Sequence, residues 1–115
     1  MQVGKLVAVW LPTVLGIVMI GAGAVNLVGP GSVRESFARW GYPAGFHRVT
    51  GGLEVTAGLL LLIPATSRAG AIGSAAILLA AMMTLIRHRD WTHLPGAVVL
   101  TAAAAAVALT IRGID

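Results

Sequence analysis

Glu54 is a single carboxylate near the middle of an apolar stretch, residues 46–64, that is long enough to cross most of a bilayer. An acid at the centre of a membrane helix costs about 2.5 to 3.5 kcal/mol, so such residues usually face protein and pair with another group. Two roles are open for this side chain. It accepts a proton or anchors a polar ligand in a cavity, or it forms an interhelical hydrogen bond to Asn26, to Thr84 or to a backbone carbonyl.

Other polar side chains lie near the ends of the apolar stretches and could bind a ligand together with Glu54. They offer amide, phenol, imidazole and guanidinium groups, which suit the polar head of a quinone or a lipid. The residues are Asn26, Tyr42, His47, Arg87 and His88. No independent catalytic constellation accompanies them, so we predict no catalytic residue and expect that the protein is not an enzyme.

Three histidines, His47, His88 and His93, raise the question of a metal or a haem. Outside the polar loop at residues 87–93 no two of them are closely spaced on one helix, and the chain has no cysteine. Metal and haem sites in helical proteins depend on such ligands. We therefore predict no metal site and no haem, and the absence of cysteine excludes disulfides and thiol redox chemistry.

The composition indicates a membrane protein. Hydrophobic residues make up 57% of the chain and charged residues 10%, and the mean hydropathy is +0.90. A soluble domain carries about 25% charged residues. The eight Lys and Arg residues lie mostly at the ends of apolar segments, where they act as topology and headgroup anchors, so we predict no nucleic-acid partner.

The apolar runs predict an all-α fold, an integral membrane antiparallel four-helix bundle in one domain. Its helices are expected at residues 6–28, 46–63, 69–86 and 94–111. The sequence Gly29-Pro30-Gly31 ends the first helix, and Pro64 ends the second. The first run also resembles a signal peptide, but its apolar part is long for one, so we expect a retained helix.

A short amphipathic helix is predicted at residues 32–40, between the first two membrane helices. Ser32 suits the N-cap, and Glu35 lies three residues further on, which is the spacing of a capping box. We expect this helix to lie in the interface plane, with Trp40 and Tyr42 at the level of the lipid headgroups.

Small residues recur at helical spacing and predict close packing between helices. The four predicted faces are Gly16, Met19, Gly23 and Asn26; His47, Gly51, Glu54, Gly58 and Leu61; Gly70, Gly73, Ile77, Ala80, Thr84 and Arg87; and Ala97, Thr101, Ala104 and Ala108. Because Glu54 falls on a small-residue face, we expect it to face protein.

An up-down-up-down path brings most of the polar residues to one membrane surface. Glu54 lies about 12 Å below this surface at 1.5 Å per residue, so it could form the floor of a cavity that opens there. Five basic residues lie on this side, Arg34, Arg39, Arg48, Arg87 and Arg89, against Lys5, Arg68 and Arg112 on the other. The positive-inside rule then favours both termini outside the cell, in a bacterial inner membrane.

Three segments together resemble the bacterial DoxX-like family of small four-helix membrane proteins: residues 37–43 (FARWGYP), 50–54 (TGGLE) and 59–64 (LLLLIP). The resemblance covers nearly the whole chain. Such proteins often have Gly-Lys-Leu near the end of the first helix, where this chain has Val25-Asn26-Leu27. The resemblance implies no settled activity, although some members are associated with quinone-linked or thiol-redox membrane complexes.

We expect a small non-catalytic subunit of a larger bacterial membrane complex. One alternative is a binder, or minor subunit, for a quinone or other lipophilic ligand, with Glu54 as the cavity floor and Tyr42, His47 and His88 as its polar wall. A second alternative is an oligomeric transporter or channel. The expected partners are membrane lipids and a larger complex or a homo-oligomer, and no cofactor is expected other than a bound quinone or lipid.

Overall fold

The computed structural model describes residues 2–110, and within them the chain is helical with no strand. The predicted all-α class is therefore confirmed. The helices are α1 (Gln2–Val28), α2 (Gly31–Arg39), α3 (Phe46–Leu62), α4 (Ser67–Arg87) and α5 (Leu94–Thr110), with a short 3₁₀ turn at Pro64–Thr66. The predicted end of the last helix at residue 111, and the base Arg112, lie outside the described residues.

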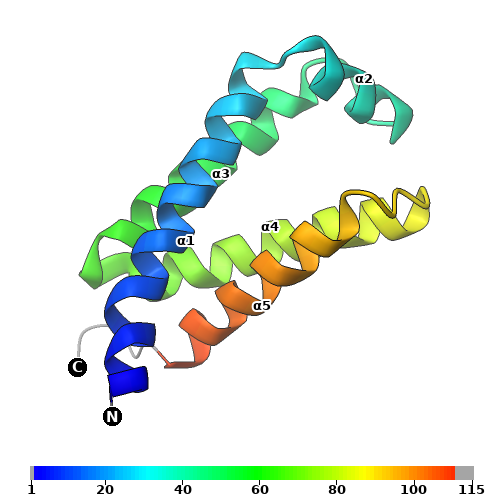
Figure 1. Ribbon diagram of the computed structural model, residues 1–115. Helices are drawn as coiled ribbons and strands as arrows, with labels where there is room; N and C mark the ends of the chain where they lie inside the picture. Colours follow the sequence, from blue (N-terminus) through cyan, green and yellow to red (C-terminus); the bar gives the residue numbers. More distant parts are fainter. Residues whose placement is uncertain (1, 111–115) are drawn as a thin grey trace.

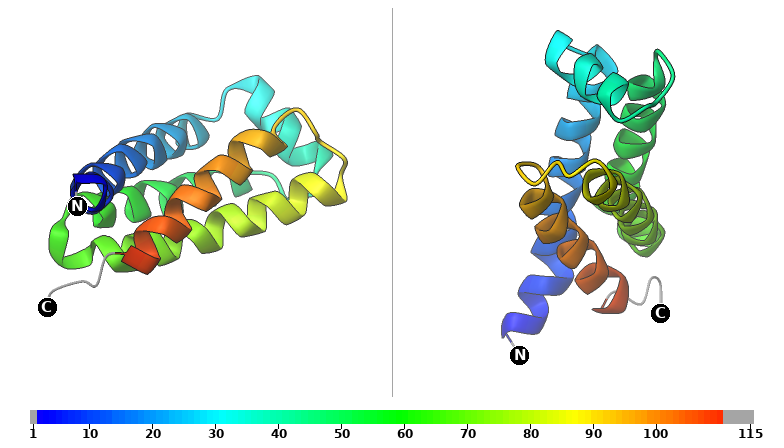
Figure 2. Two further views of the ribbon diagram at one scale, coloured as in Figure 1. Left: turned by 60° about the horizontal axis from the view of Figure 1, so that its bottom comes forward. Right: turned by 90° about the vertical axis from the view of Figure 1, so that its right-hand side faces the viewer.

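The long helices are arranged as two pairs. Helix α1 packs along α3, and α4 packs along α5 (Figure 1). The pairs meet near the start of α1 and diverge toward α2, which lies at the open end together with the loop between α4 and α5 (Figures 1 and 2). Most of the polar residues predicted to share one surface belong to these two segments.

The contact between α1 and α3 is made by two reciprocal glycine pairs. A Cβ atom added to Gly16 would lie 2.9 Å from the Gly58 carbonyl oxygen, and one added to Gly23 would lie 2.6 Å from that of Gly51. The same additions on α3 would meet the α1 backbone at 2.7 and 2.6 Å. Only glycine permits this backbone approach, so the small-residue faces predicted for residues 6–28 and 46–63 are confirmed.

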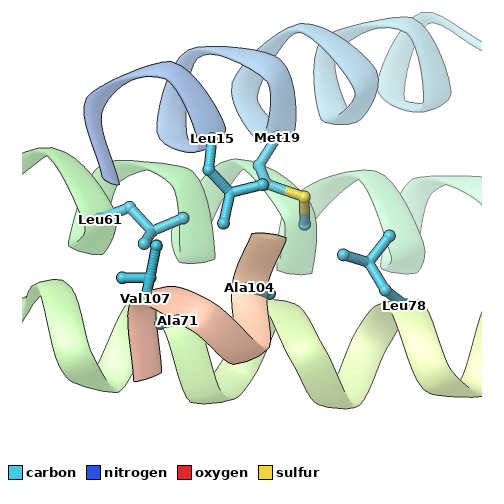
Figure 3. Packing of buried hydrophobic residues seen from close by; sticks show 7 residues of the cluster. All are labelled: Leu15, Met19, Leu61, Ala71, Leu78, Ala104 and Val107. Atoms are coloured by element: carbon cyan, nitrogen blue, oxygen red, sulfur yellow. The ribbon is translucent and has the colours of Figure 1, made fainter. Parts of the chain in front are cut away.

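A small hydrophobic core joins the two pairs where they meet (Figure 3). Leu15 and Met19 of α1 are almost completely buried there, against residues from the other three long helices. The cluster also contains Leu61, Ala71, Leu78, Ala104 and Val107. On α5, the buried residues Ala97 and Ala104 belong to the predicted small-residue face.

The predicted packing face of α4 was only partly right. Gly70 packs against the α3 backbone, since a Cβ atom added to it would lie 2.6 Å from the Leu61 nitrogen. Gly73, in contrast, has open space around it. The buried side of α4 instead carries Ala71, Ser74 and Leu78. Most residues of α4 can lie against lipid, a cavity or protein. The helical spacing of its small residues could therefore not show which side of α4 is buried.

The predicted capping box at the start of α2 is not formed. The helix begins at Gly31, one residue after Pro30, and no side chain caps it. Ser32 therefore lies inside the first turn rather than before it. Pro30 N-terminal to the helix has a fixed φ, and its carbonyl oxygen accepts hydrogen bonds from the backbone N–H groups of Val33 and Arg34.

Two helical segments are apolar and long enough to cross a membrane, Val3–Val28 and Pro64–Arg87. At 1.5 Å per residue α3 and α5 are each about 25 Å long, shorter than a hydrocarbon core of about 30 Å. Large apolar side chains are exposed on several helices. Val28, Met83 and Leu109 are 81%, 72% and 84% exposed, as expected of side chains that face lipid.

Candidate functional site

Glu54 is held by a residue of the neighbouring helix. The Asn26 side chain on α1 donates a hydrogen bond from Nδ2 to Glu54 Oε1 on α3, at 2.5 Å. Glu54 is 8% exposed. The close backbone contact at Gly23 and Gly51, three residues before each partner, sets the distance between the two helices. Of the partners that the sequence left open for Glu54, the structure therefore selects Asn26.

Both residues lie on the wall of a cavity of about 340 Å³ between α3 and α4, beneath α2. Most of its lining is apolar or aromatic, and the polar contribution is small. The lining residues are Asn26, Phe37, Trp40, Tyr42, Phe46, Thr50, Leu53, Glu54, Ile77, Leu78, Ala80, Ala81, Thr84, Leu85 and His93. A concave, mostly apolar site with a few polar groups is typical of a small-molecule pocket.

Four aromatic rings form one side of this cavity. Phe37 lies at their centre, with its ring 5.3 Å from Trp40, 5.8 Å from Tyr42 and 6.4 Å from Phe46, measured between centroids. Tyr42 and Phe46 are stacked at 4.6 Å and almost parallel. We call these four residues the aromatic wall.

The end of α2 positions Tyr42. Gly41 adopts a left-handed conformation with φ of 86°, and its N–H donates to Ala38 O while the Tyr42 N–H donates to Phe37 O. This pair of bonds is a Schellman motif, in which a hydrophobic contact accompanies the turn. Here the contact is that between the Phe37 and Tyr42 rings. The local sequence Trp-Gly-Tyr therefore builds part of the aromatic wall.

Tyr42 also joins the segment after α2 to α4. Its hydroxyl lies 2.5 Å from Thr84 Oγ1. The Thr84 hydroxyl donates to Ala80 O in its own helix at 3.0 Å, so the Tyr42 hydroxyl is the donor to Thr84. This bond lies between the cavity and a more open depression of about 830 Å³ on the outer side, because Tyr42 and Thr84 line both.

Arg87 and His88 lie in the outer depression and not in the cavity with Glu54. Both side chains are exposed, and His88 Nδ1 donates to Thr84 O at 3.0 Å. The sequence placed His88 on the polar wall around Glu54, which the structure does not support. The cause is the direction of α4, since its last turn extends past the Tyr42 contact.

His47 lines neither cavity. Its side chain is buried under the turn after α1, where a Cβ atom on Gly29 would overlap the imidazole ring, and its edge faces Phe37 at 6.3 Å. The predicted role of His47 as polar wall was therefore wrong. It packs behind the aromatic wall because Gly29, with φ of 65°, lets the chain turn closely over the ring.

The sequence model of the DoxX-like family matches residues 10–107. The chain belongs to the DoxX-like family. No curated protein and no solved structure matches it. The matched region contains every residue that lines the cavity of this DoxX-like protein. The family is membrane-associated, which agrees with the two apolar helical segments long enough to cross a bilayer.

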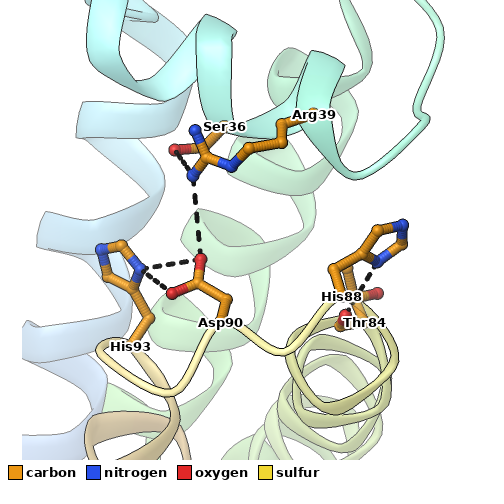
Figure 4. A network of polar contacts seen from close by, with 6 residues as sticks. All are labelled: Ser36, Arg39, Thr84, His88, Asp90 and His93. Atoms are coloured by element: carbon orange, nitrogen blue, oxygen red, sulfur yellow. Dashed lines mark hydrogen bonds and ion pairs between the residues drawn. The ribbon is translucent and has the colours of Figure 1, made fainter.

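A polar network at the open end of the DoxX-like chain connects α2 to the loop between α4 and α5 (Figure 4). Arg39 Nη2 lies 3.9 Å from Asp90 Oδ2, and His93 Nδ1 lies 2.9 Å from Asp90 Oδ1. The hydrogen bond from His93 is the main cause that holds the pKa of Asp90 below its usual value of 3.8. The Trp40 indole also lowers the pKa of Asp90, as the smallest of these causes. Its Nε1 atom is buried and lies outside the distance and angle limits of a normal hydrogen bond.

Several cavity residues of this DoxX-like protein were absent from the sequence-based candidates. The main omissions are Phe37, Trp40 and Phe46, whose rings form most of the aromatic wall. Their spacing along residues 37–46 gave a signal, because aromatic residues gathered around a Gly-Tyr-Pro turn can meet on one side. Within residues 2–110 no three His, Asp or Glu side chains are close enough to hold a metal ion.

Proposed function

We propose that this DoxX-like protein binds a lipophilic small molecule with a polar head group in the cavity between α3 and α4. The observation that carries the proposal is the placement of the Asn26–Glu54 pair on the wall of an otherwise apolar, aromatic cavity. The pair would bind the polar head, and the aromatic wall would cover the apolar part. The volume of about 340 Å³ suits a ligand with one or two rings.

The proposal includes a membrane topology. Helices α1, α3, α4 and α5 would cross a bacterial inner membrane as an antiparallel bundle, with α2 in the interface and both termini outside. The exposed apolar side chains on these helices support it, as does the gathering of polar groups near α2. The short helices α3 and α5 would require a locally thinner bilayer or headgroup anchors at their ends.

The test is native mass spectrometry of the protein extracted into lipid nanodiscs. We expect a lipophilic molecule to remain bound at about one per chain. The variant Ala81→Phe places a ring in the cavity and should release it, because Ala81 lines the cavity. The matched control Ala76→Phe, on an exposed position of the same helix, should retain it. Equal retention by both variants would contradict the proposal.

The accessory-subunit role that we expected from the sequence remains a prediction, and the same preparation tests it. A larger membrane protein that co-purifies in fixed ratio with the wild type and with Ala81→Phe would support a subunit whose contacts lie outside the cavity. The oligomeric transporter is tested separately, by solute flux into liposomes that contain only this protein.

A further inference from the structure

The cavity wall carries an acidic side chain without a basic partner. Among the residues that line it, Glu54 is the one carboxylate, and no Lys or Arg is present. The one basic side chain in the lining, His93, already contacts the Asp90 carboxylate at 2.9 Å. The partner of Glu54 is Asn26, a neutral amide that donates a single hydrogen bond to Oε1. A carboxylate in a bilayer is stabilised most by an opposite charge, which the lining of this cavity does not supply.

The second carboxylate oxygen is available to a ligand. Within residues 2–110, Glu54 Oε2 has no hydrogen-bond partner, since the bond from Asn26 is made to Oε1. Glu54 is buried from bulk solvent yet lies on the cavity wall. An ammonium or another cationic group in the cavity could therefore approach Oε2 without displacing Asn26.

The aromatic wall supplies the other half of a cation site. The faces of aromatic rings carry negative potential and attract cations, most strongly where water is excluded. The rings of the aromatic wall line the same cavity as Glu54, and the centroids of neighbouring rings lie 4.6 to 6.4 Å apart. A carboxylate and clustered rings on the wall of one cavity form an arrangement that can recognise quaternary ammonium groups.

We infer that the ligand of this cavity is a lipophilic organic cation, bound by Glu54 and the aromatic wall. The inference rests on the proposed function, because it assigns a chemical class to the ligand of the same cavity. A neutral ligand such as a quinone would gain hydrogen bonds from Asn26 but would leave Glu54 without a cationic partner. An anionic ligand would meet the carboxylate as a like charge.

The test compares decyltrimethylammonium with 1-decanol, which share a chain length and differ in charge. Trp40 is the one tryptophan on the cavity wall, whereas Trp10 and Trp91 are 61% and 57% exposed. In the variant Trp10→Phe/Trp91→Phe, fluorescence therefore reports on the cavity and on the outer depression, because Trp40 lines both, and the Glu54→Gln variant separates the two. Titrations in nanodiscs, with empty nanodiscs subtracted, give the two affinities. Size exclusion and thermal unfolding check that each variant is folded.

We expect the cation to bind about tenfold more tightly than the alcohol. Glu54→Gln should remove this preference by weakening binding of the cation, because glutamine still accepts the bond from Asn26 but carries no negative charge. The matched control Glu35→Gln, on an exposed acid outside the cavity, should keep the preference. Equal affinities in the wild type, or a preference that persists in Glu54→Gln, would overturn the inference.

Decylubiquinone, as a third ligand, separates the two proposals. If decanol or decylubiquinone binds and the cation does not, the ligand class is wrong while the proposed function stands. If none of the three ligands changes the Trp40 fluorescence, the proposed function and the inference both fail.

Discussion

Asn26 Nδ2 lies 2.5 Å from Glu54 Oε1, and this bond joins α1 to α3 at the wall of the cavity. It lies one helical turn from the backbone contact between Gly23 and Gly51. Because the two helices cannot separate without opening that contact, the amide is held against the carboxylate. The bond therefore serves two purposes, since it holds the helix pair together and fixes the orientation of Glu54 toward the cavity.

Replacing Asn26 by Leu removes the donor and leaves Glu54 buried without its partner. We expect a loss of about 1 to 3 kcal/mol in the free energy of unfolding, measured by denaturant titration in micelles. The double variant Asn26→Leu/Glu54→Leu should recover much of this loss, because neither polar group then remains unpaired. A single variant as stable as the wild type would show that the bond contributes nothing.

Gly23→Ala tests the close approach of α1 and α3. The added Cβ would lie 2.6 Å from the Gly51 carbonyl oxygen, so the helices must move apart. We expect a destabilisation of about 1 to 3 kcal/mol. Gly21→Ala, two residues away with open space around it, is the control and should be stabilising by about 0.5 to 1 kcal/mol. The same effect at both positions would argue against the contact.

Gly29→Ala should be more harmful than Gly45→Ala. Both glycines have left-handed backbones, with φ of 65° and 85°, so each alanine costs about 1 to 2 kcal/mol. Gly45 has open space, whereas a Cβ on Gly29 overlaps the His47 ring. Adding His47→Ala should relieve only the overlap, so the double-mutant cycle should show coupling between positions 29 and 47. Additive effects would exclude the predicted overlap.

The stability of the contact between α2 and the loop at residues 88–93 should depend on pH through the Asp90 carboxyl group. Its pKa lies below 3.8 in the folded protein, chiefly because His93 donates a hydrogen bond to the carboxylate. The stabilisation is then fully present above pH 3.8 and is lost as the pH falls through the lower folded-state pKa. Carboxyl ¹³C NMR should show the pKa of Asp90 rising toward its usual value in His93→Gln.

The control for this titration is His88→Gln. The His88 ring donates to Thr84 O and is not among the hydrogen-bond or ion-pair partners of the Asp90 carboxylate, so the pKa of Asp90 should not change. A rise of equal size in both histidine variants would point to a general change in net charge and not to the hydrogen bond from His93.

The sequence by itself was sufficient for the features that depend on local periodicity. Apolar runs predicted the helices, because a bilayer accepts a backbone only when its polar groups are bonded internally. The breaks at Gly29-Pro30-Gly31 and at Pro64 follow from backbone geometry. The spacing of Gly16 and Gly23, and of Gly51 and Gly58, predicted a packing face because two glycines on one side of each helix leave room for a backbone.

Part of the candidate site was also visible in the sequence. A lone acid in an apolar helix requires a partner, and Asn26 was among the few polar residues within reach. Tyr42 was placed near the cavity by its position in the Trp-Gly-Tyr-Pro turn. These predictions depend only on the free-energy cost of leaving a polar group without a partner in lipid.

Only the tertiary structure decided which side chains surround Glu54. His47 and Phe37 are both close in sequence to residues that line the cavity. The turn at Gly29 nevertheless packs over the His47 imidazole and buries it, whereas the Phe37 ring lies on the cavity wall. On α4, Thr84 faces the cavity while His88, one turn later, lies outside it. The physical reason is that a helical period defines faces, whereas the angle at which two helix pairs diverge decides what each face contacts.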